Sequence, residues 1–468
     1  MLRTALAWLA PVAVGVAGVL VLGAWLEVRP GVPISLRLPT RQELEALEAK
    51  AEKPVDLTGF FQQGEGEPSD IGASWPQFRG PRRDGVIRAE VALRSDFSAE
   101  DPPPELWRVE MGQGYAGAAV HAGRVYVLDY DEELRADVLR CLSLDDGREI
   151  WHRGYHVDIS RQHGVSRTVP AVTDEHVVTI GPKCHVLCAE AKTGDLLWAI
   201  DLVKEYGTKT PAWYTAQCPL IDRGRAILAP AGPDVLMLAV DLTNGEVVWK
   251  ASNPRGWQMT HSSIMPMDLD GRRTYVYAAS GGAGAVDAET GEIVWLTDRW
   301  KVNMATSPSP IVAGPRRVLF VGGYGSGAMM ARLDGEPVEV VEQFRLKPNV
   351  FGSEQQTPIL HEGHVYGLRE DGQLVCVSLD GEMKWQSGRL NRFGPKGRGP
   401  YIIADGKLIL LTTDGTLHFV QPTGEAFRPL GSVKVMDGFE AWAPLALADG
   451  RLILRDLTTM VCLDLRKK

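Results

Sequence analysis

Polar and aromatic side chains that could bind a ligand recur at one kind of place in this chain of 468 residues. Each comes shortly before a stretch of alternating apolar residues, the pattern of a β-strand. Arginine, glutamine and glutamate hydrogen-bond to anionic or planar groups, and tryptophan offers a face for stacking. The residues predicted to form such a ligand site are Arg167, Gln217, His261, Gln356, Arg398, Glu440 and Trp442.

The same side chains could instead satisfy one another in a water-filled channel. Arg167 and Arg398 could pair with Glu354 or Glu440, which would need no ligand. The dipeptide Cys184-His185 lacks two further metal ligands nearby. We therefore predict no catalytic residue and no metal site, and both interpretations of the polar residues stay open.

A repeated phrase sets the elements that must position these residues. Ala239-Val-Asp-Leu-Thr-Asn-Gly-Glu-Val-Val-Trp249 returns with few changes as the segment that ends in Trp295. Apolar alternation runs into a turn whose glycine can adopt positive φ and then resumes, which predicts a β-hairpin. Copies of this glycine recur about every 43 to 51 residues, the spacing of propeller blades. They are Gly147, Gly194, Gly245, Gly291, Gly335, Gly381 and Gly424.

Tryptophan follows the turn glycine by four residues in five of these copies. Because one tryptophan buries about 150 to 250 Å², a residue at this fixed place is a natural wedge between neighbouring sheets. In the other two copies the place falls near residues 338–341 and Phe427. The tryptophans predicted to pack between blades are Trp107, Trp151, Trp198, Trp249, Trp295 and Trp385.

Two end fragments predict that the repeats close into a ring. Leu106-Trp-Arg-Val109 is the tail of a repeat without its head, and residues 460–465 are a head without a tail. Together they form an eighth copy and remove the free sheet edges. The predicted fold is all-β: an eight-bladed β-propeller with four-stranded blades, closed by an N-terminal strand that completes the last blade.

The N-terminus differs from the rest of the chain. Residues 5–26 carry no charge, and about 22 apolar positions suffice to cross a bilayer as a helix. We expect a membrane anchor over residues 1–29, with a cleavable signal peptide as the alternative. Arg3 makes the segment before the anchor positive, which is expected to keep that segment in the cytoplasm. The propeller of a single-pass chain would then lie in the periplasm or outside.

Residues 30–74 are interpreted as a linker with one short helix near Thr40, and residues 75–468 as the propeller. A net charge of −9 disfavours nucleic-acid binding, because phosphate contacts need clustered lysine and arginine. We expect a monomer whose six cysteines are buried thiols.

At the phrase Asp-x-x-Thr-Gly-x-x-x-Trp the chain resembles the pyrroloquinoline-quinone (PQQ) repeat propellers, whose tryptophan-docking motif and eight-bladed ring it matches. Trp75-Pro-Gln-Phe-Arg-Gly-Pro81 is similar to an opening phrase of the bacterial cell-envelope branch. The family includes quinone-dependent alcohol and glucose dehydrogenases. It also includes the non-enzymatic BamB-type propeller of the outer-membrane β-barrel assembly machinery.

The two branches imply different functions. The alcohol-oxidising enzymes hold their quinone beside a ring of adjacent cysteines, with calcium on carboxylate and amide oxygens. No two cysteines are neighbours here, and no Cys-x-x-Cys-His haem segment exists. We expect a membrane-tethered scaffold that binds other envelope proteins, without catalysis and without a cofactor. The alternatives are a PQQ-dependent dehydrogenase with PQQ and calcium, and a small-molecule or glycan sensor that binds at the axial mouth.

Overall fold

A computed structural model describes residues 15–23, 54–88, 91–160, 164–388, 393–394 and 397–467. The chain forms two compact units, Met1–Pro54 and Val55–Lys468. In the first unit, residues 15–23 are helical. No helix within the described ranges is long and apolar enough to cross a membrane, so the predicted transmembrane helix is not found there. The other residues of the predicted anchor, and the short helix expected near Thr40, lie outside the described ranges.

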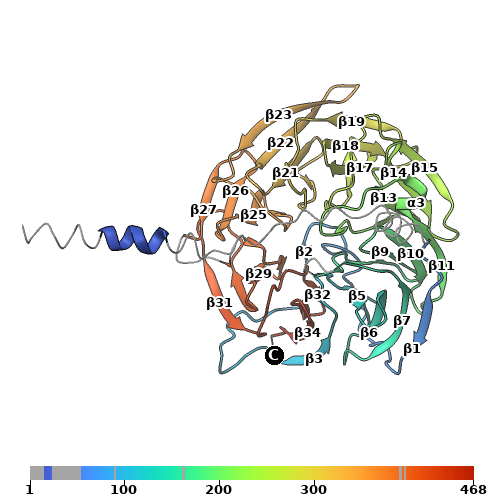
Figure 1. Cartoon of the computed structure of the whole chain (residues 1–468), viewed down its shortest axis with the longest axis horizontal. Helices are drawn as coiled ribbons and strands as arrows, with labels where there is room; N and C mark the ends of the chain where they lie inside the picture. The colour runs from blue at the N-terminus through green and yellow to red at the C-terminus, as the bar shows by residue number, and fades with distance from the viewer. Residues whose placement is uncertain are drawn as a thin grey trace, which may run out of the picture. The chain divides into compact units, whose positions relative to one another are not determined.

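Eight β-sheets are arranged around one axis in the second unit, which confirms the predicted eight-bladed propeller (Figure 1). In blades 1 to 4 the strands are, from axis to rim, β4 (Ala119–His121), β5 (Arg124–Asp131), β6 (Ala136–Ser143) and β7 (Glu149–His156); β8 (Ala171–Val172), β9 (His176–Ile180), β10 (His185–Glu190) and β11 (Leu196–Asp201); β12 (Leu220–Asp222), β13 (Arg225–Leu228), β14 (Val235–Asp241) and β15 (Val247–Ser252); β16 (Met265–Leu269), β17 (Arg272–Ala279), β18 (Gly282–Asp287) and β19 (Ile293–Thr297).

In blades 5 to 8 they are β20 (Ile311–Val312), β21 (Arg317–Gly322), β22 (Gly327–Asp334) and β23 (Glu339–Leu346); β24 (Ile359–His361), β25 (His364–Leu368), β26 (Leu374–Ser378) and β27 (Met383–Gln386); β28 (Tyr401–Ala404), β29 (Lys407–Leu411), β30 (Thr416–Val420) and β31 (Pro429–Lys434); β32 (Ala446–Ala448), β33 (Arg451–Arg455), β34 (Thr459–Asp464) and β3 (Glu105–Glu110).

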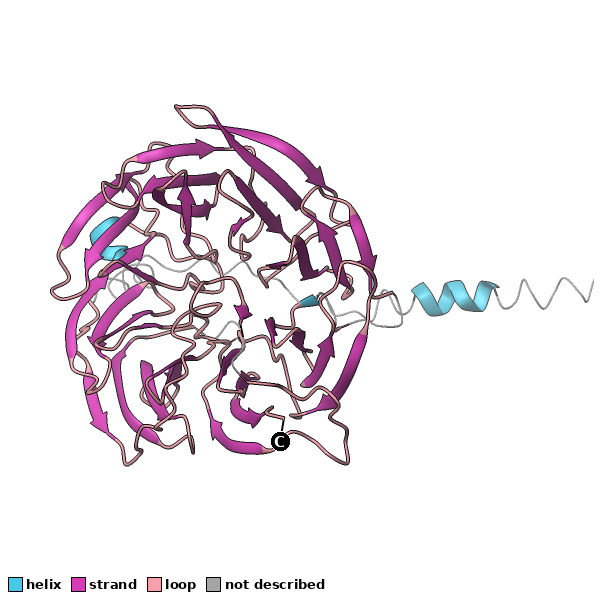
Figure 2. Ribbon diagram, turned by 180° about the vertical axis from the view of Figure 1, so that it is seen from behind, coloured by secondary structure: helices cyan, strands magenta, loops and turns pink. Residues whose placement is uncertain are grey.

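Burial explains why the strands of one blade differ in sequence. Middle strands such as β18 lie between neighbouring sheets and are buried along their whole length, whereas the rim strand β23 alternates between exposed and half-buried residues. Figure 2 shows the ring as strands joined by loops, and the short helix α3 (Leu202–Tyr206) follows β11 directly.

The ring closes as the sequence predicted. Strand β3 pairs antiparallel with β34 and places Trp107 opposite Cys462, so the N-terminal strand is the outer strand of blade 8. All six cysteines are buried free thiols.

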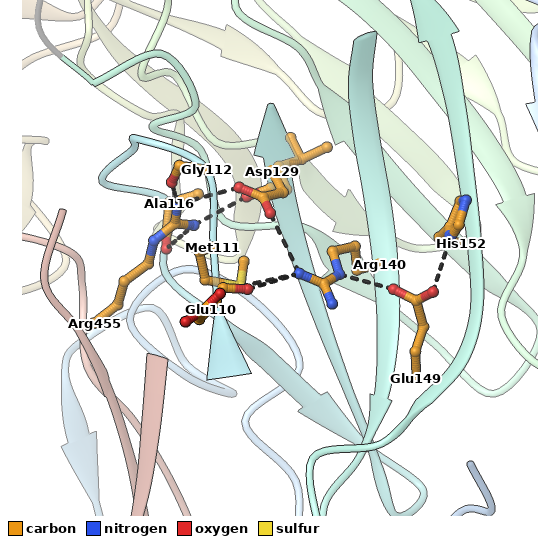
Figure 3. Close-up of polar contacts among 10 residues, drawn as sticks. Glu110, Met111, Gly112, Ala116, Asp129, Arg140, Glu149, His152 and Arg455 are labelled. Carbon is orange, nitrogen blue, oxygen red and sulfur yellow. Dashed lines mark hydrogen bonds and ion pairs between the residues drawn. The ribbon is translucent and has the colours of Figure 1, made fainter. Parts of the chain in front are cut away.

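Buried charges also cross this seam (Figure 3). Arg455, at the end of β33, is 1% exposed and donates from Nη2 to the carbonyl of Gly112 at 2.7 Å and from Nη1 to that of Leu128 at 3.2 Å. It also pairs with Asp129 of blade 1 at 3.4 Å, and Asp129 pairs with Arg140 at 3.4 Å. The seam between blades 8 and 1 is therefore held by a buried ion pair as well as by strand pairing.

Tryptophan rings seal the other blade interfaces. The Nε1 of Trp249 donates to the carbonyl of Ala288 in the turn of the next blade at 3.0 Å. A Cβ atom on Gly291 would lie 2.6 Å from the Trp249 ring, so this turn needs glycine for close approach as well as for its φ of 74°. The same donation to the next blade is made by Trp107, Trp151, Trp198 and Trp385.

Two positions differ from the repeat. Trp295 is buried, but its Nε1 has no hydrogen-bond partner among the described residues. In blade 5 the wedge is Phe344 rather than residues 338–341, because its ring lies 3.0 Å from where a Cβ on Gly381 would stand. Phe427 packs against the Trp385 ring at 5.8 Å. The spacing rule failed in blade 5 because Phe344, which faces Met330, stands farther along its strand from the turn than Trp295, which faces Ala285.

The prediction of a linker over residues 30–74 does not hold for residues 54–74, the part that the structure describes. Strand β1 (Phe60–Gln63) adds a fifth strand to the outer edge of blade 1 by pairing with β7. Beyond it, the amide of Gly64 donates to Ile150 and that of Ser69 to Gly123, at 2.8 and 3.0 Å. A Cβ on Gly64 would stand 2.0 Å from the carbonyl oxygen of Glu149. The glycines that suggested flexibility serve close packing against the ring.

Residues 75–87, here named the axial plug, cross the centre of the ring. Trp75 exchanges two backbone hydrogen bonds of 2.8 Å with Val120 of blade 1. Strand β2 (Val86–Ile87) pairs in parallel with β28 at the inner edge of blade 7. Between these points the plug binds inner-strand or adjacent backbone groups at Val172, Pro219, Thr357 and Pro358. One short segment thus ties together the inner edges of five blades.

Candidate functional site

Loops that precede the inner strands converge on a pocket of about 220 Å³ at the mouth of the ring, here named the axial pocket. The axial plug contributes Phe78 to its lining. Closure of the ring forces these loops together, because every blade sends the start of its first strand toward the axis. Five of the seven residues predicted from the sequence line the pocket: Arg167, His261, Gln356, Arg398 and Trp442.

The other two predicted residues do not line it. Gln217 is fully buried and its side-chain amide forms a pair of hydrogen bonds with the backbone of Ala229, at 3.2 and 3.0 Å. Its place is structural, since it joins the loop to strand β13. Glu440 accepts a short hydrogen bond from the hydroxyl of Tyr115, which does line the pocket.

Two aromatic rings and two arginines form a layered stack in the pocket. The rings of Tyr115 and Trp442 are stacked with centroids 5.0 Å apart and planes 24° apart. The guanidinium of Arg398 lies 4.7 Å from the Trp442 centroid, and that of Arg167 lies 4.9 Å from the Tyr115 centroid. Both distances are within the range of cation–π attraction. The stack fixes the two arginines at opposite ends of one aromatic wall.

The two arginines differ in their charge balance. Arg398 is paired with Glu354, a carboxylate 1% exposed, through a 3.0 Å contact from Nε and a shorter one from Nη2. Arg167 forms no ion pair with any carboxylate of the described ranges, and its Nε donates to the carbonyl of Trp213 at 2.6 Å. Burial lowers the pKa of Arg167, yet the group remains a cation at neutral pH. Of the two pocket arginines, Arg167 is therefore the one without an ion pair among the described residues.

His261 is neutral at pH 7. Burial, followed by the positive charge of Arg167, lowers its pKa to about 4. Its Nδ1 is buried and finds no hydrogen-bond partner in the described part of the chain. The ring lies 6.5 Å from that of Trp213. The neutral imidazole therefore lines the pocket without adding charge to it.

Strained backbone gathers around the same pocket. Trp213, Tyr214, Tyr324 and Glu440 have φ angles of 62°, 71°, 55° and 56°. Positive φ is uncommon outside glycine and unusual for bulky side chains, costing about 1 kcal/mol or more per residue. Such strain persists only where packing over-determines it, and it clusters at ligand sites.

Comparisons with known proteins bear on this ring and its pocket. Residues 135–298 and 296–427 match a family model described as outer membrane protein assembly factor BamB, and together they span more than half of the chain. The chain belongs to this family. No curated protein matches the sequence.

Solved structures similar to this BamB-family chain come from both branches of the fold. BamB from Moraxella catarrhalis is 16% identical with a TM-score of 0.53, covering 77% of this chain and 99% of that one. The quinohemoprotein alcohol dehydrogenase from Comamonas testosteroni is 13% identical with a TM-score of 0.59, covering 85% and 81%. A europium-containing methanol dehydrogenase is 13% identical with a TM-score of 0.56, covering 82% and 89%. At these low identities the similarity shows a shared fold alone.

The axial pocket of this BamB-family chain does not fit a quinone held with calcium. Its neighbouring carboxylates, Glu354 and Glu440, are engaged by Arg398 and Tyr115. Its one lining thiol, Cys218, is buried, and burial raises the pKa of that thiol. Nowhere in the described ranges do three His, Cys, Asp or Glu side chains gather so as to hold a metal. The volume of about 220 Å³ is also below the roughly 300–1,000 Å³ usual for small-molecule sites.

The pocket residues that sequence reasoning missed include three with large aromatic side chains, Tyr115, Trp213 and Tyr324. Trp213 directly precedes the segment 214–217 in which the sequence singled out Gln217, so the aromatic residue was the better candidate of the two. Tyr115 and Tyr324 stand in Gly-rich turns that carry no periodic signal. Only the closed ring brings them beside Arg167 and Arg398.

Proposed function

We propose that this protein is a scaffold of the cell envelope that binds other proteins and performs no catalysis. The observation that carries the proposal is the surface of the mouth. Phe439 is 68% exposed and Met304 is 64% exposed, more than any other large apolar side chain described in the second unit. Phe439 precedes Glu440, and Met304 precedes the pocket residue Ala305. Exposed apolar side chains beside a pocket are typical of a protein-binding surface.

Family membership supports the same proposal, because the family model carries the description of an assembly factor. We place the propeller outside the cytoplasm, in the periplasm or beyond, with the uncharged residues 5–26 acting as an export signal or anchor. Cell fractionation with protease protection tests this placement. A propeller that protease reaches only after the inner membrane is broken would contradict it.

Affinity capture from envelope extracts tests the scaffold proposal. The full chain is expected to retain a reproducible set of envelope proteins, and the double variant Phe439→Ser with Met304→Ser is expected to lose most of them. Val248→Ser and Leu430→Ser, which change residues of rim strands exposed by 44% and 41%, are the matched controls. Equal capture by all variants would contradict a binding surface at the mouth. Quinone- and calcium-dependent oxidation of an alcohol by the purified chain would favour the dehydrogenase alternative.

A second candidate is a sensor that binds a small molecule or glycan in the axial pocket. The stacked Tyr115 and Trp442 and the strained backbone favour it. A ligand that binds the native state raises its melting temperature by mass action. Under this function Trp442→Ala or His261→Ala abolishes ligand-induced stabilisation while the ring stays folded. A variant that keeps the full ligand-induced shift would exclude the pocket as the site.

A further inference from the structure

Positive charge gathers on the axis of a chain whose net charge is −9. Arg83 of the axial plug is buried and Arg79 is half-buried. Desolvation lowers the pKa of each to about 10, so both remain charged at neutral pH. Neither forms an ion pair within the described ranges. Arg79 binds backbone carbonyls, and Arg83 leaves Nε and Nη2 without a hydrogen-bond partner there.

This buried charge lies against the pocket. The guanidinium of Arg83 is 5.8 Å from the centroid of Phe78, which lines the pocket. Charges in a low-dielectric interior are weakly screened, so their potential extends into a neighbouring cavity. Glu440 offsets part of the charge of Arg167. Asp84 likewise offsets part of the charge of Arg79, whereas Arg83 pairs with no carboxylate of the described ranges. The axial pocket is therefore positive.

Arg167 is the cation that an incoming group can reach. It lines the pocket and is partly exposed, and its side chain forms one hydrogen bond with the described residues, from Nε to the carbonyl of Trp213. Its two Nη groups bind no other described residue. The planar fork of a guanidinium matches the two oxygens of a carboxylate. The Tyr115 ring beneath it holds the fork in place.

We propose that the axial pocket receives an acidic side chain that protrudes from a partner protein, whose carboxylate pairs with Arg167. A pocket of about 220 Å³ accommodates one side chain more readily than a large ligand. The apolar surface around that side chain would cover Phe439 and Met304. This inference rests on the proposed scaffold function and names the chemistry by which its partner is recognised.

A pair of blocked peptides tests the inference. The probes are acetyl-Gly-Phe-Glu-Phe-Gly-amide and its Gln counterpart, titrated against the full chain at low salt with tryptophan fluorescence as readout, since Trp213 and Trp442 line the pocket. The Glu peptide is expected to bind about tenfold tighter than the Gln peptide, and added salt should shrink this preference. Equal binding of the two peptides would overturn the proposal.

Variants of Arg167 identify the recognising group. Arg167→Gln should remove the preference for Glu, and Arg167→Lys should keep part of it because the charge remains while the fork is lost. Arg255→Gln changes an exposed arginine paired with Asp298 and is the matched control. An unchanged preference in folded Arg167→Gln would overturn the proposal, with folding verified by the melting curve.

Two further arms separate this inference from the scaffold function itself. Glutarate titrated alone tests whether the pocket binds a free small carboxylate. If glutarate binds as tightly as the Glu peptide, the proposal that the carboxylate comes from a partner protein is overturned. In affinity capture, equal retention of envelope proteins by the wild type and Arg167→Gln would overturn the pocket's role and leave the scaffold standing. No retention by the wild type would contradict the scaffold.

Discussion

Trp249 and Trp295 stand at the same position of adjacent blades, and only one of them has its indole N–H satisfied. Trp249 donates to Ala288, whereas the Nε1 of Trp295 is buried without a partner in the described residues. Replacement by phenylalanine removes the donor from both sites and a similar apolar area. We predict that Trp249→Phe costs about 1 kcal/mol more unfolding free energy than Trp295→Phe, because it removes a buried hydrogen bond that Trp295 does not form, although the Ala288 carbonyl keeps its bond from Arg225. Equal losses in urea denaturation would contradict this.

Asp137 makes the stability of the folded protein depend on pH. Burial, only partly opposed by the hydrogen bond from the Tyr155 hydroxyl, raises its pKa from 3.8 to about 7. Between these values the unfolded chain has lost a proton that the folded chain keeps, so this group makes stability fall as pH rises from about 4 to 7. We predict that Asp137→Asn stabilises the protein above pH 7 by about 2–4 kcal/mol and flattens that slope. Thermal melts across this pH range check it, and no gain at pH 8 would contradict it.

At the scale of elements, the sequence predicted the hairpins of the blades correctly. It failed for segments that do not follow the repeat. Turn glycines and alternating apolar residues are local signals, so they located the blades directly. Gly64 shows the limit, because the same glycine-rich composition describes a flexible linker and a strand pressed against a sheet edge. Phe344 was missed because it stands farther along its strand from the turn glycine than the tryptophan of the other repeats does.

A pair of glycine substitutions tests the attachment of β1. Gly64→Ala would place a Cβ 2.0 Å from a backbone oxygen, whereas Gly72→Ala meets nothing within 4 Å and serves as its control. We predict that Gly64→Ala releases the segment around β1, raising its amide hydrogen exchange by about tenfold or more, while the other blades keep their protection. Protection of β1 that stays equal in both variants would contradict the packing described.

At the scale of the whole molecule, closure brings the loops before the eight inner strands together in one site. Five of the predicted residues meet in the pocket because every inner strand begins at the axis, whatever its side chains. Gln217 was predicted wrongly because its side chain points to the backbone of Ala229, and Glu440 because it binds the Tyr115 hydroxyl instead of lining the pocket. The periodicity of a sequence reveals neither contact. The positive φ angles and the axial plug were equally out of reach, since both depend on contacts distant in sequence.

The seam between blades 8 and 1 gives a prediction at the same scale. Arg455→Met would remove one of the two arginines paired with Asp129 and the side-chain donor to several buried carbonyls, at a cost of about 2–4 kcal/mol of unfolding free energy. Arg332→Met breaks an ion pair whose side chains are 54% and 40% exposed, and it should cost well under about 1 kcal/mol. Comparable losses for the two variants in chemical denaturation would contradict a seam held by Arg455.

The central claim is that the mouth of the ring is where this scaffold meets its partner. Its most direct test is a photo-crosslinking amino acid placed at Phe439 in the full chain within intact cells, with the same amino acid at Val248 of the rim as control. The account predicts a discrete crosslinked envelope protein from position 439, weakened by Arg167→Gln, and none from position 248. No crosslink at position 439, or the same products from both positions, would contradict it.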